Sequence, residues 1–267
     1  MAAVLALPLV GQDAMSPDPN MPRPIEAHDS VFIEELTWME VRDAMRAGKD
    51  TILVASGGVE MNGPYLVTGK HQVVLRANME ALARKLGDAL VAPIVQFVPE
   101  GDFDPPTSHM RYPGAISVRV ETFEALLTDI AESFRTHQFK HVIFLSDSNN
   151  NVAPMQAVAD RLSKKWSGSK TSIHYVPEFY KSNSASDLLA SLGIEQKAEG
   201  HHDNVPNATQ MMVTDPTTVR AYQRIAAGKM SINGVDISPP HGIELGRKIV
   251  DYRATIAAKA IHKATAM

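Results

Sequence analysis

Short apolar runs rich in β-branched residues alternate along this chain with longer stretches of helical periodicity. Residues 51–56 and 141–145 have the length and composition of buried strands, and residues 89–95 and 171–176 are further candidates. Apolar residues recur at helical spacing in 38–47, 73–87, 121–134, 155–166, 186–192, 216–227 and 243–264. The alternation predicts an α/β fold of three layers, α/β/α, with a mostly parallel central sheet covered on both faces. Residues 229–240, with Asn-Gly and Pro-Pro pairs, are expected to form a loop.

Polar side chains follow the two clearest strands. Glu60, Asn62 and His71 come after the first strand, and Asp147 comes directly after the second. Ligands of open α/β sheets bind beyond the carboxyl ends of the strands, and Glu60 and His71 are suitable metal ligands or acid–base groups. The alternative is a pair of ordinary solvated loops. Turn and N-cap chemistry explains the serines and asparagines of 146–151, but it explains Asp147 less well.

A third polar cluster contains His201, His202 and Asp203. Adjacent residues point in different directions on a helix or a strand, so we expect at most one of the two histidines to face a shared site. The alternative is a polar surface loop. His109, in a proline-rich loop with Asp102 and Asp104, could line a pocket mouth or reach a neighbouring subunit, or the loop could be plain turn chemistry.

These segments, in this order, resemble the creatininase family of creatinine amidohydrolase-like, metal-dependent hydrolases over about residues 30–255. That family has a Glu-Gln-His-Gly-Pro-His-Leu segment after a strand, where this chain has Glu60-Met61-Asn62-Gly63-Pro64-Tyr65-Leu66. Its later His and aromatic-Pro-Gly-Thr-Ile-Ser run resembles the stretch from His109 to Ser117. Its Asn-Gly-His-Gly-Gly-Asn and His-Ala-Gly segments resemble 146–151 and 202–204, the latter followed by a methionine-rich helix.

The family binds two metals through Glu, His, Asp, His and Glu, and this chain departs from the family at those positions. Only the first is kept, as Glu60; the other positions carry Asn62, His71, Ser148, and Asn150 or Asn207. Asparagine and serine are poor ligands for zinc or manganese, so an intact two-metal centre is not expected. The carboxylate and histidines gained nearby favour one divalent metal, zinc or manganese, held by Glu60, His71 and Asp147 with a water.

The resemblance implies a creatininase-like fold and a hydrolase that cleaves a carbon–nitrogen bond in a cyclic or other small amide, with a metal-bound water as nucleophile. His202 aligns with the family's proton-donating histidine, and the other expected catalytic residues are Asp147 and Glu60. Asp147 is the candidate base if it is not a ligand. Residues expected to bind substrate are Asn62, Tyr65, His109 and Asp203, although a buried aromatic with a satisfied hydroxyl is the simpler role for Tyr65.

Three alternatives stay open. The chain could be an inactive family member that binds a small molecule or serves in an assembly, a metal-free hydrolase using His71 and Asp147, or a lactone-opening enzyme. The resemblance also implies a homo-oligomer, often a hexamer in this family.

Composition excludes several other classes. The net charge of −4 gives no footprint for nucleic acid, and no basic run suggests a membrane surface. The lack of cysteine excludes disulfides, thiolate metal sites and cysteine nucleophiles. A Gly-x-Ser-x-Gly elbow, a Gly-x-Gly-x-x-Gly loop and a Walker loop are absent, so a nucleotide enzyme or a serine hydrolase of the usual kind is not expected. The expected partner is a small-molecule substrate.

The amino-terminal 1–29 segment differs from the rest. Residues 2–10 are apolar like the core of a secretory signal, but they lack a basic start and are too short to span a membrane. We expect a signal remnant and a periplasmic or secreted protein, with a cytoplasmic one as the alternative. Residues 16–24, rich in proline, read as a linker to a single domain over 30–267.

Overall fold

A computed structural model of the chain describes residues 17–195 and 201–266. Its centre is a parallel sheet in the order β2-β1-β3-β4. The strands are β1 (Thr51–Ser56), β2 (Ala89–Val91), β3 (His141–Ser146) and β4 (Ser172–Tyr175). β1 and β3 pair in register from Thr51 opposite His141 to Ser56 opposite Ser146, so the loops after both strands leave the sheet at the same edge.

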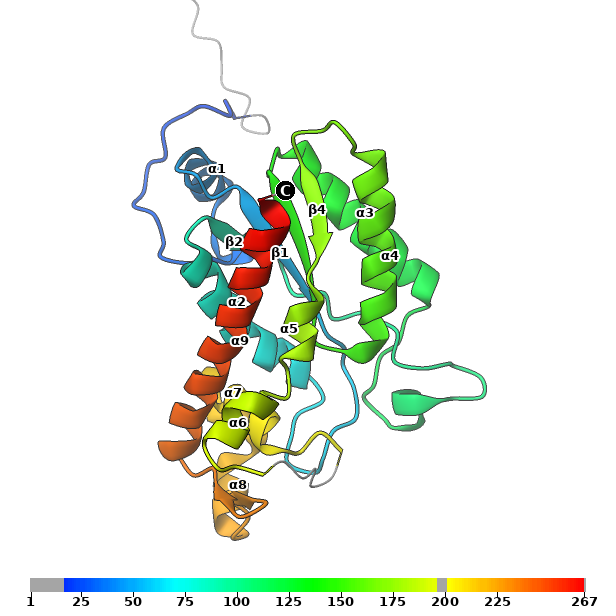
Figure 1. Ribbon diagram of the computed structural model, residues 1–267, viewed down its shortest axis with the longest axis vertical. Coiled ribbons are helices and arrows are strands. Elements are labelled where there is room, and N and C mark those ends of the chain that lie inside the picture. Colours follow the sequence, from blue (N-terminus) through cyan, green and yellow to red (C-terminus); the bar gives the residue numbers. More distant parts are fainter. Residues whose placement is uncertain (1–16, 196–200, 267) are drawn as a thin grey trace, which may run out of the picture.

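Helices cover both faces of this sheet (Figure 1), which confirms the α/β/α expectation. One face packs on α1 (Trp38–Arg46), α3 (Val120–Thr136) and α4 (Asn149–Lys165). The other packs on α2 (Lys70–Leu86), α5 (Pro177–Lys181) and α9 (His241–Thr265). Short 3-10 turns, η1 (Ile33–Glu35), η2 (Ser108–Arg111) and η3 (Pro216–Val219), occur in the connections.

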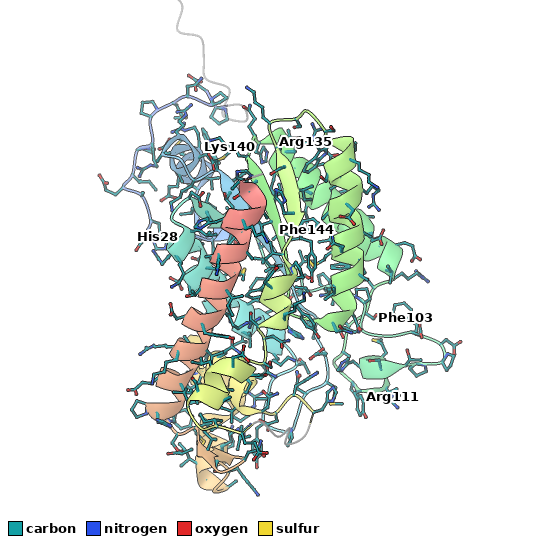
Figure 2. All side chains as sticks on the ribbon, viewed as in Figure 1. His28, Phe103, Arg111, Arg135, Lys140 and Phe144 are labelled. Carbon is teal, nitrogen blue, oxygen red and sulfur yellow. The ribbon has the colours of Figure 1, made fainter. Side chains whose placement is uncertain are left out.

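The alternation of side chains along each strand divides the core in two. Ile52 and Val54 of β1 point into the cluster with α3 and α4, whereas Leu53 and Ala55 point into the cluster with α2 and α9. Every residue of β1 is buried, as parallel strands covered on both faces require. Phe144 of β3 lies inside the first cluster, while Phe103 and Arg111 lie on a loop that extends from the domain (Figure 2).

A third apolar cluster lies beyond the sheet edge where β1 and β3 end. It joins α6 (Ser186–Ser191), α7 (Val205–Thr214), α8 (Ala221–Ala226) and the first turns of α9. Beside it, β5 (Ser231–Ile232) and β6 (Val235–Asp236) form a small antiparallel ribbon. This cluster supplies the far wall of the site described below.

Several predicted boundaries were wrong. The helix expected from residue 73 begins at Lys70, which places His71 in its first turn, and the helix expected from 155 begins at Asn149. The stretch 216–227 divides at Arg220, whose φ of 53° is left-handed, into η3 and α8. The expected loop 229–240 contains the β5–β6 ribbon, because Asn233-Gly234 adopts the positive φ angles that a tight hairpin requires.

Thr37 caps the start of α1, where it forms a capping box with Glu40. The apolar stretch 2–10 lies outside the described residues. No helix in the described part of the chain is long and apolar enough to cross a membrane.

Candidate functional site

Glu60 lies at the centre of the candidate site, in the loop between β1 and α2, and it is buried. Its Oε1 atom lies 2.8 Å from Lys70 Nζ, 2.9 Å from His202 Nδ1 and 3.3 Å from His71 Nε2. Burial by itself would raise the pKa of Glu60, but the hydrogen bonds from His202 and His71 and the charge of Lys70 hold it well below its usual range. Glu60 is therefore an anion at neutral pH.

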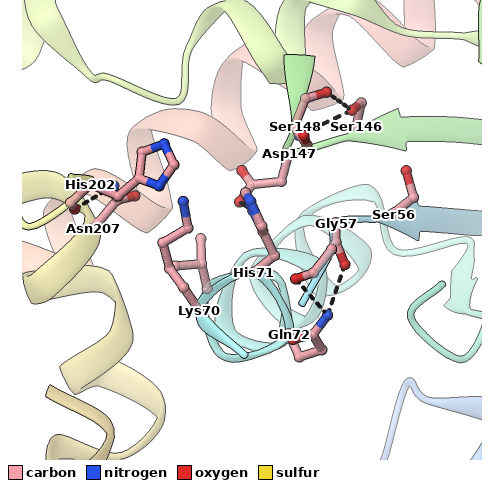
Figure 3. Close-up of polar contacts among 12 residues, drawn as sticks. Ser56, Gly57, Lys70, His71, Gln72, Ser146, Asp147, Ser148, His202 and Asn207 are labelled. Carbon is pink, nitrogen blue, oxygen red and sulfur yellow. Dashed lines mark hydrogen bonds and ion pairs between the residues drawn. The ribbon is translucent and has the colours of Figure 1, made fainter. Parts of the chain in front are cut away.

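His71 lies between two carboxylates. Its Nδ1 atom is 2.7 Å from Asp147 Oδ2, at the end of β3, and its Nε2 atom faces Glu60. Burial and the nearby Lys70 oppose a charge on the imidazole, yet the two carboxylates raise the pKa of His71 above its usual value. Lys70 and His71 rise together from the first turn of α2, Lys70 toward His202 and His71 toward Asp147 (Figure 3).

An arginine of α9, Arg253, holds Asp147 in place. Arg253 is fully buried, and its Nη2 atom donates to Asp147 Oδ1 at 2.7 Å. Burial raises the pKa of Asp147, but the Arg253 charge and the His71 hydrogen bond lower it to about 2. Arg253 Nη1 also donates to Gln210 of α7, which in turn accepts from Asn78 of α2. A continuous buried polar chain thus connects α2, α7, α9 and β3.

The other oxygen of Glu60 belongs to a second cluster. His109 Nε2 lies 3.5 Å from Glu60 Oε2 and 4.0 Å from Glu100 Oε2. Glu100 is fully buried, and neither of its carboxylate oxygens has a hydrogen-bond partner among the described residues. Burial and the charge of Glu60 raise the pKa of Glu100 to about 8. One ligand atom from each of these three residues lies within 4.8 Å of the other two, which is suitable spacing for a metal ion.

A glycine makes room for this carboxylate. A Cβ atom placed on Gly58 would lie 1.7 Å from Glu100 Oε1 and 2.9 Å from Val98 Cγ2. No side chain larger than hydrogen fits at position 58 while Glu100 keeps its place. The pair Gly57-Gly58 after β1 therefore has a packing role that its position at a strand end alone does not reveal.

The segment 201–204 closes the site from the other side. His202 has a left-handed φ of 61°, and its carbonyl accepts from Asn207 Nδ2 at 3.0 Å. Its Nδ1 atom lies 3.1 Å from Asn62 Oδ1, so Asn62 and Glu60 together hold the ring. Burial lowers the pKa of His202, which keeps the imidazole neutral at pH 7. His201 is exposed, so of the two neighbours His202 is the one that faces Glu60.

A cavity of about 400 Å³ opens beside these groups. Five residues expected from the sequence line it: Glu60, His71, His109, Asp147 and His202. Tyr65 and Asp203 are placed elsewhere. Asp203 is buried, with both carboxylate oxygens 2.6 and 2.7 Å from Arg224 Nη2, and the same guanidinium lies over the Tyr65 ring. The roles in catalysis and ligation expected for all of these residues stay predictions.

Sequence reasoning missed Lys70, Glu100 and Arg253. Lys70 precedes His71 in the sequence, but its place in the site follows only from the start of α2 at Lys70. Arg253 carried a visible signal, because it occupies the buried stripe formed at four-residue spacing by Leu245, Ile249, Ala257 and Ile261. An arginine on such a stripe needs a buried acidic partner. Glu100 carried none, since its neighbours in space come from distant parts of the chain.

Comparisons with known proteins agree on a single family. The family model for creatininase, described as creatinine amidohydrolase, matches residues 34–255. No curated protein matches. Among solved structures, a manganese form of creatininase aligns with a TM-score of 0.65 at 19% identity, covering 88% of this chain and 99% of that one.

Two further structures align in the same way. A creatinine amidohydrolase gives a TM-score of 0.63 at 18% identity, covering 89% of this chain and 99% of its own. A creatininase mutant of the zinc–zinc type gives 0.62 at 19% identity, again over 89% and 99%. These likenesses confirm the fold, and the family match spans most of the chain. The chain belongs to the creatininase family, whose members are amidohydrolases that act on non-peptide carbon–nitrogen bonds.

Proposed function

We propose that this protein is a metal-dependent hydrolase that cleaves a carbon–nitrogen bond in a cyclic or other small amide. The observation that carries the proposal is the buried carboxylate of Glu100, which has no hydrogen-bond partner among the described residues, beside Glu60 and His109 in a chain of this family. Such a carboxylate is costly as an anion, so it either keeps a proton, as the raised pKa of Glu100 indicates here, or is compensated by a cation such as a metal ion.

The three side chains suit a divalent metal. Ligands about 2.1 Å from a zinc ion stand roughly 3.4 Å apart in a tetrahedral site. The separations of 3.5 and 4.0 Å from His109 Nε2 to the two carboxylates are slightly longer than that value, and one ligand atom of each residue lies within 4.8 Å of the others. Zinc or manganese held there would polarise a carbonyl group and activate a water molecule. Two carboxylates and an imidazole are a donor set that both metals accept.

Of the three metal ligands expected from the sequence, only Glu60 is retained here. His71 and Asp147 take another role. Both nitrogens of His71 already face carboxylates, and Asp147 Oδ1 is bound to Arg253. The buried chain Arg253–Asp147–His71 therefore positions Glu60 through its contact with His71, as residues that contact metal ligands do at metal sites.

His202 is the proposed carrier of the proton that the leaving nitrogen requires. It lines the cavity, contacts Glu60 and is neutral at pH 7, so it can accept a proton and return it. Asn62 fixes its orientation through the contact with Nδ1. We expect His202→Asn to lower the turnover of a small cyclic amide by roughly a hundredfold or more without removing the metal.

The first test is the metal content of the untagged protein by elemental analysis, with Glu100→Gln, His71→Ala and the exposed-site control Glu121→Gln. We expect near-stoichiometric zinc or manganese in the parent and the control, and at least a tenfold weaker affinity in Glu100→Gln. Gly58→Ala should act like Glu100→Gln, because the added Cβ displaces that carboxylate.

Each other outcome has a definite meaning. Metal lost in His71→Ala but kept in Glu100→Gln would return the site to Glu60, His71 and Asp147. A parent that takes up no metal after reloading would overturn the metal mechanism.

A metal-free hydrolase is the second candidate. It is supported by the ion pair of Lys70 with Glu60 at 2.8 Å and by the His71–Asp147 contact at 2.7 Å, which hold these groups together without a metal. Hydrolysis of amides or lactones that survives a chelator and is lost in His71→Ala would favour it.

A further inference from the structure

The cavity beside Glu60 is rich in hydrogen-bond donors. Lys70 lines it with a side chain only 4% exposed, and the ion pair with Glu60 Oε1 uses one of the three N–H groups of the ammonium. Tyr180 of α5, Asn149 and Asn183 line the same cavity, and each of these residue types carries a hydrogen-bond donor. A ligand that satisfies these groups must bring acceptor oxygens.

The start of α4 adds to this donor surface. Ser148, Asn149 and Asn150 line the cavity, and the N-cap Ser148 makes no side-chain capping hydrogen bond to the helix. The first N–H groups of a helix have no partner within it, and together with the helix dipole they favour an anion. α4 has 17 residues, so the dipole is fully developed. The start of α4 lies beside the same cavity as the buried ammonium group of Lys70, which belongs to α2.

Each carboxylate in the wall has a cation beside it, which reduces its repulsion of an anion. Lys70 compensates Glu60, and Arg253 compensates Asp147 from outside the cavity at 2.7 Å. Both wall anions are thus matched by cations before a ligand enters. At about 400 Å³, the cavity has the size of a small-molecule site.

We propose that the substrate is a small amide that carries its own carboxylate, bound by Lys70 with help from Tyr180 and the N-terminus of α4. This inference rests on the function proposed above and names the class of its substrate. A single ammonium suits a carboxylate. A phosphate group, with its greater charge, usually recruits several cations or an arginine fork.

The test is isothermal titration of the full-length chain, as purified and after chelator treatment, with pyroglutamate, neutral pyrrolidone, glutarate and inorganic phosphate. We expect pyroglutamate or glutarate to bind at least tenfold more tightly than pyrrolidone, because hydrogen bonds to a charged group are the stronger ones. Using chelated protein excludes binding of the carboxylate to a metal.

Three variants locate the anion. Lys70→Gln removes the partner of the buried Glu60 and endangers folding, so Lys70→Arg is compared with two milder changes. Tyr180→Phe removes one hydroxyl, and Asn149→Asp adds a charge at an exposed helix start that tolerates it. Both milder changes should weaken carboxylate binding roughly tenfold. The exposed neighbour Lys181→Gln should leave it unchanged.

Three outcomes would overturn the proposal: equal binding of pyroglutamate and pyrrolidone, phosphate bound more tightly than every carboxylate, or no binding of any carboxylate. Equal weakening by Lys181→Gln and Tyr180→Phe would also do so, because the effect would then not be local. Since the titration is done without metal, its failure is separate from failure of the metal-content test.

Discussion

At the scale of single residues, the site consists of buried charged side chains whose partners come from separate loops. Glu60 and His202 are in direct contact, with His202 Nδ1 2.9 Å from Glu60 Oε1. Lys70 and Glu100 could not be found from spacing, because their meaning arises only when the loops after β1 and β2 come together. A residue type at a strand end predicts a site, whereas the identity of its charged partners depends on tertiary contacts.

Arg253 gives the first residue-scale prediction. Arg253→Met removes the arginine cation from the buried Asp147 and leaves only His71 beside it, so we expect the free energy of unfolding to fall by about 3–5 kcal/mol in urea titrations. Arg247→Met, on the exposed side of the same helix, should change it by less than about 0.5 kcal/mol. A double change with Asp147→Asn should recover part of the loss. Equal effects of the two arginines would contradict the assigned role.

At the scale of elements, periodicity predicted strands and helices well where one face is apolar. It failed at the starts of α2 and α4, where polar residues that resemble a loop form the first helical turn. The reason is physical: helix starts are stabilised by local capping and by what the first turn contacts, here Glu60 for α2. Those contacts leave no periodic signal.

Gly246 tests the contact of α9 with α7. An added Cβ would lie 2.1 Å from the Thr209 carbonyl oxygen, so the helices must separate in Gly246→Ala. Alanine normally improves a helix by about 1 kcal/mol relative to glycine, yet here we expect a net loss of about 1–3 kcal/mol. Lys248→Ala, exposed on the same helix, is the control in chemical denaturation. A gain in stability at position 246 would show that the crossing is looser than described.

A carboxylate between α3 and α4 gives a pH prediction. Hydrogen bonds from Lys165, Arg135 and Trp166 lower the pKa of Glu132 to about 2, although burial by itself would raise it. Because the folded pKa lies below the unfolded value near 4.5, this stabilisation is present above that value and is lost as the pH falls toward 2.

We therefore expect Glu132→Gln to reduce stability by about 1 kcal/mol at pH 7 and by progressively less in acid. The measurement is the urea midpoint of both proteins between neutral pH and pH 3. A difference that grows in acid would be inconsistent with this account.

At the scale of the whole molecule, the family and its fold were predicted, and the boundary at residue 30 stays a prediction. Residues 17–29 touch the domain through a few polar contacts, such as Arg42 Nη1 to the Met21 carbonyl at 2.8 Å and Arg23 to Asp43 at 3.1 Å. The expected homo-oligomer and periplasmic or secreted location also stay predictions. Composition and fold carry no signal for either.

A chain that starts at residue 30 should therefore fold in one cooperative thermal transition. We expect a loss of about 1–2 kcal/mol, because Arg42 and Asp43 exchange protein partners for water. The secondary structure by circular dichroism should match that of the full chain. A truncated chain that fails to fold would place residues 17–29 inside the domain.

The burial of β1 on both faces has a consequence for how such a protein can change over evolutionary time. All six of its residues are buried, and the four apolar ones pack alternately into two cores, so nearly any substitution there disturbs a layer of helices as well as the site. The opposite wall, at α7, rests on a separate apolar cluster. New substrate preferences can therefore arise by altering that wall while the strand that presents Glu60 is inherited almost intact.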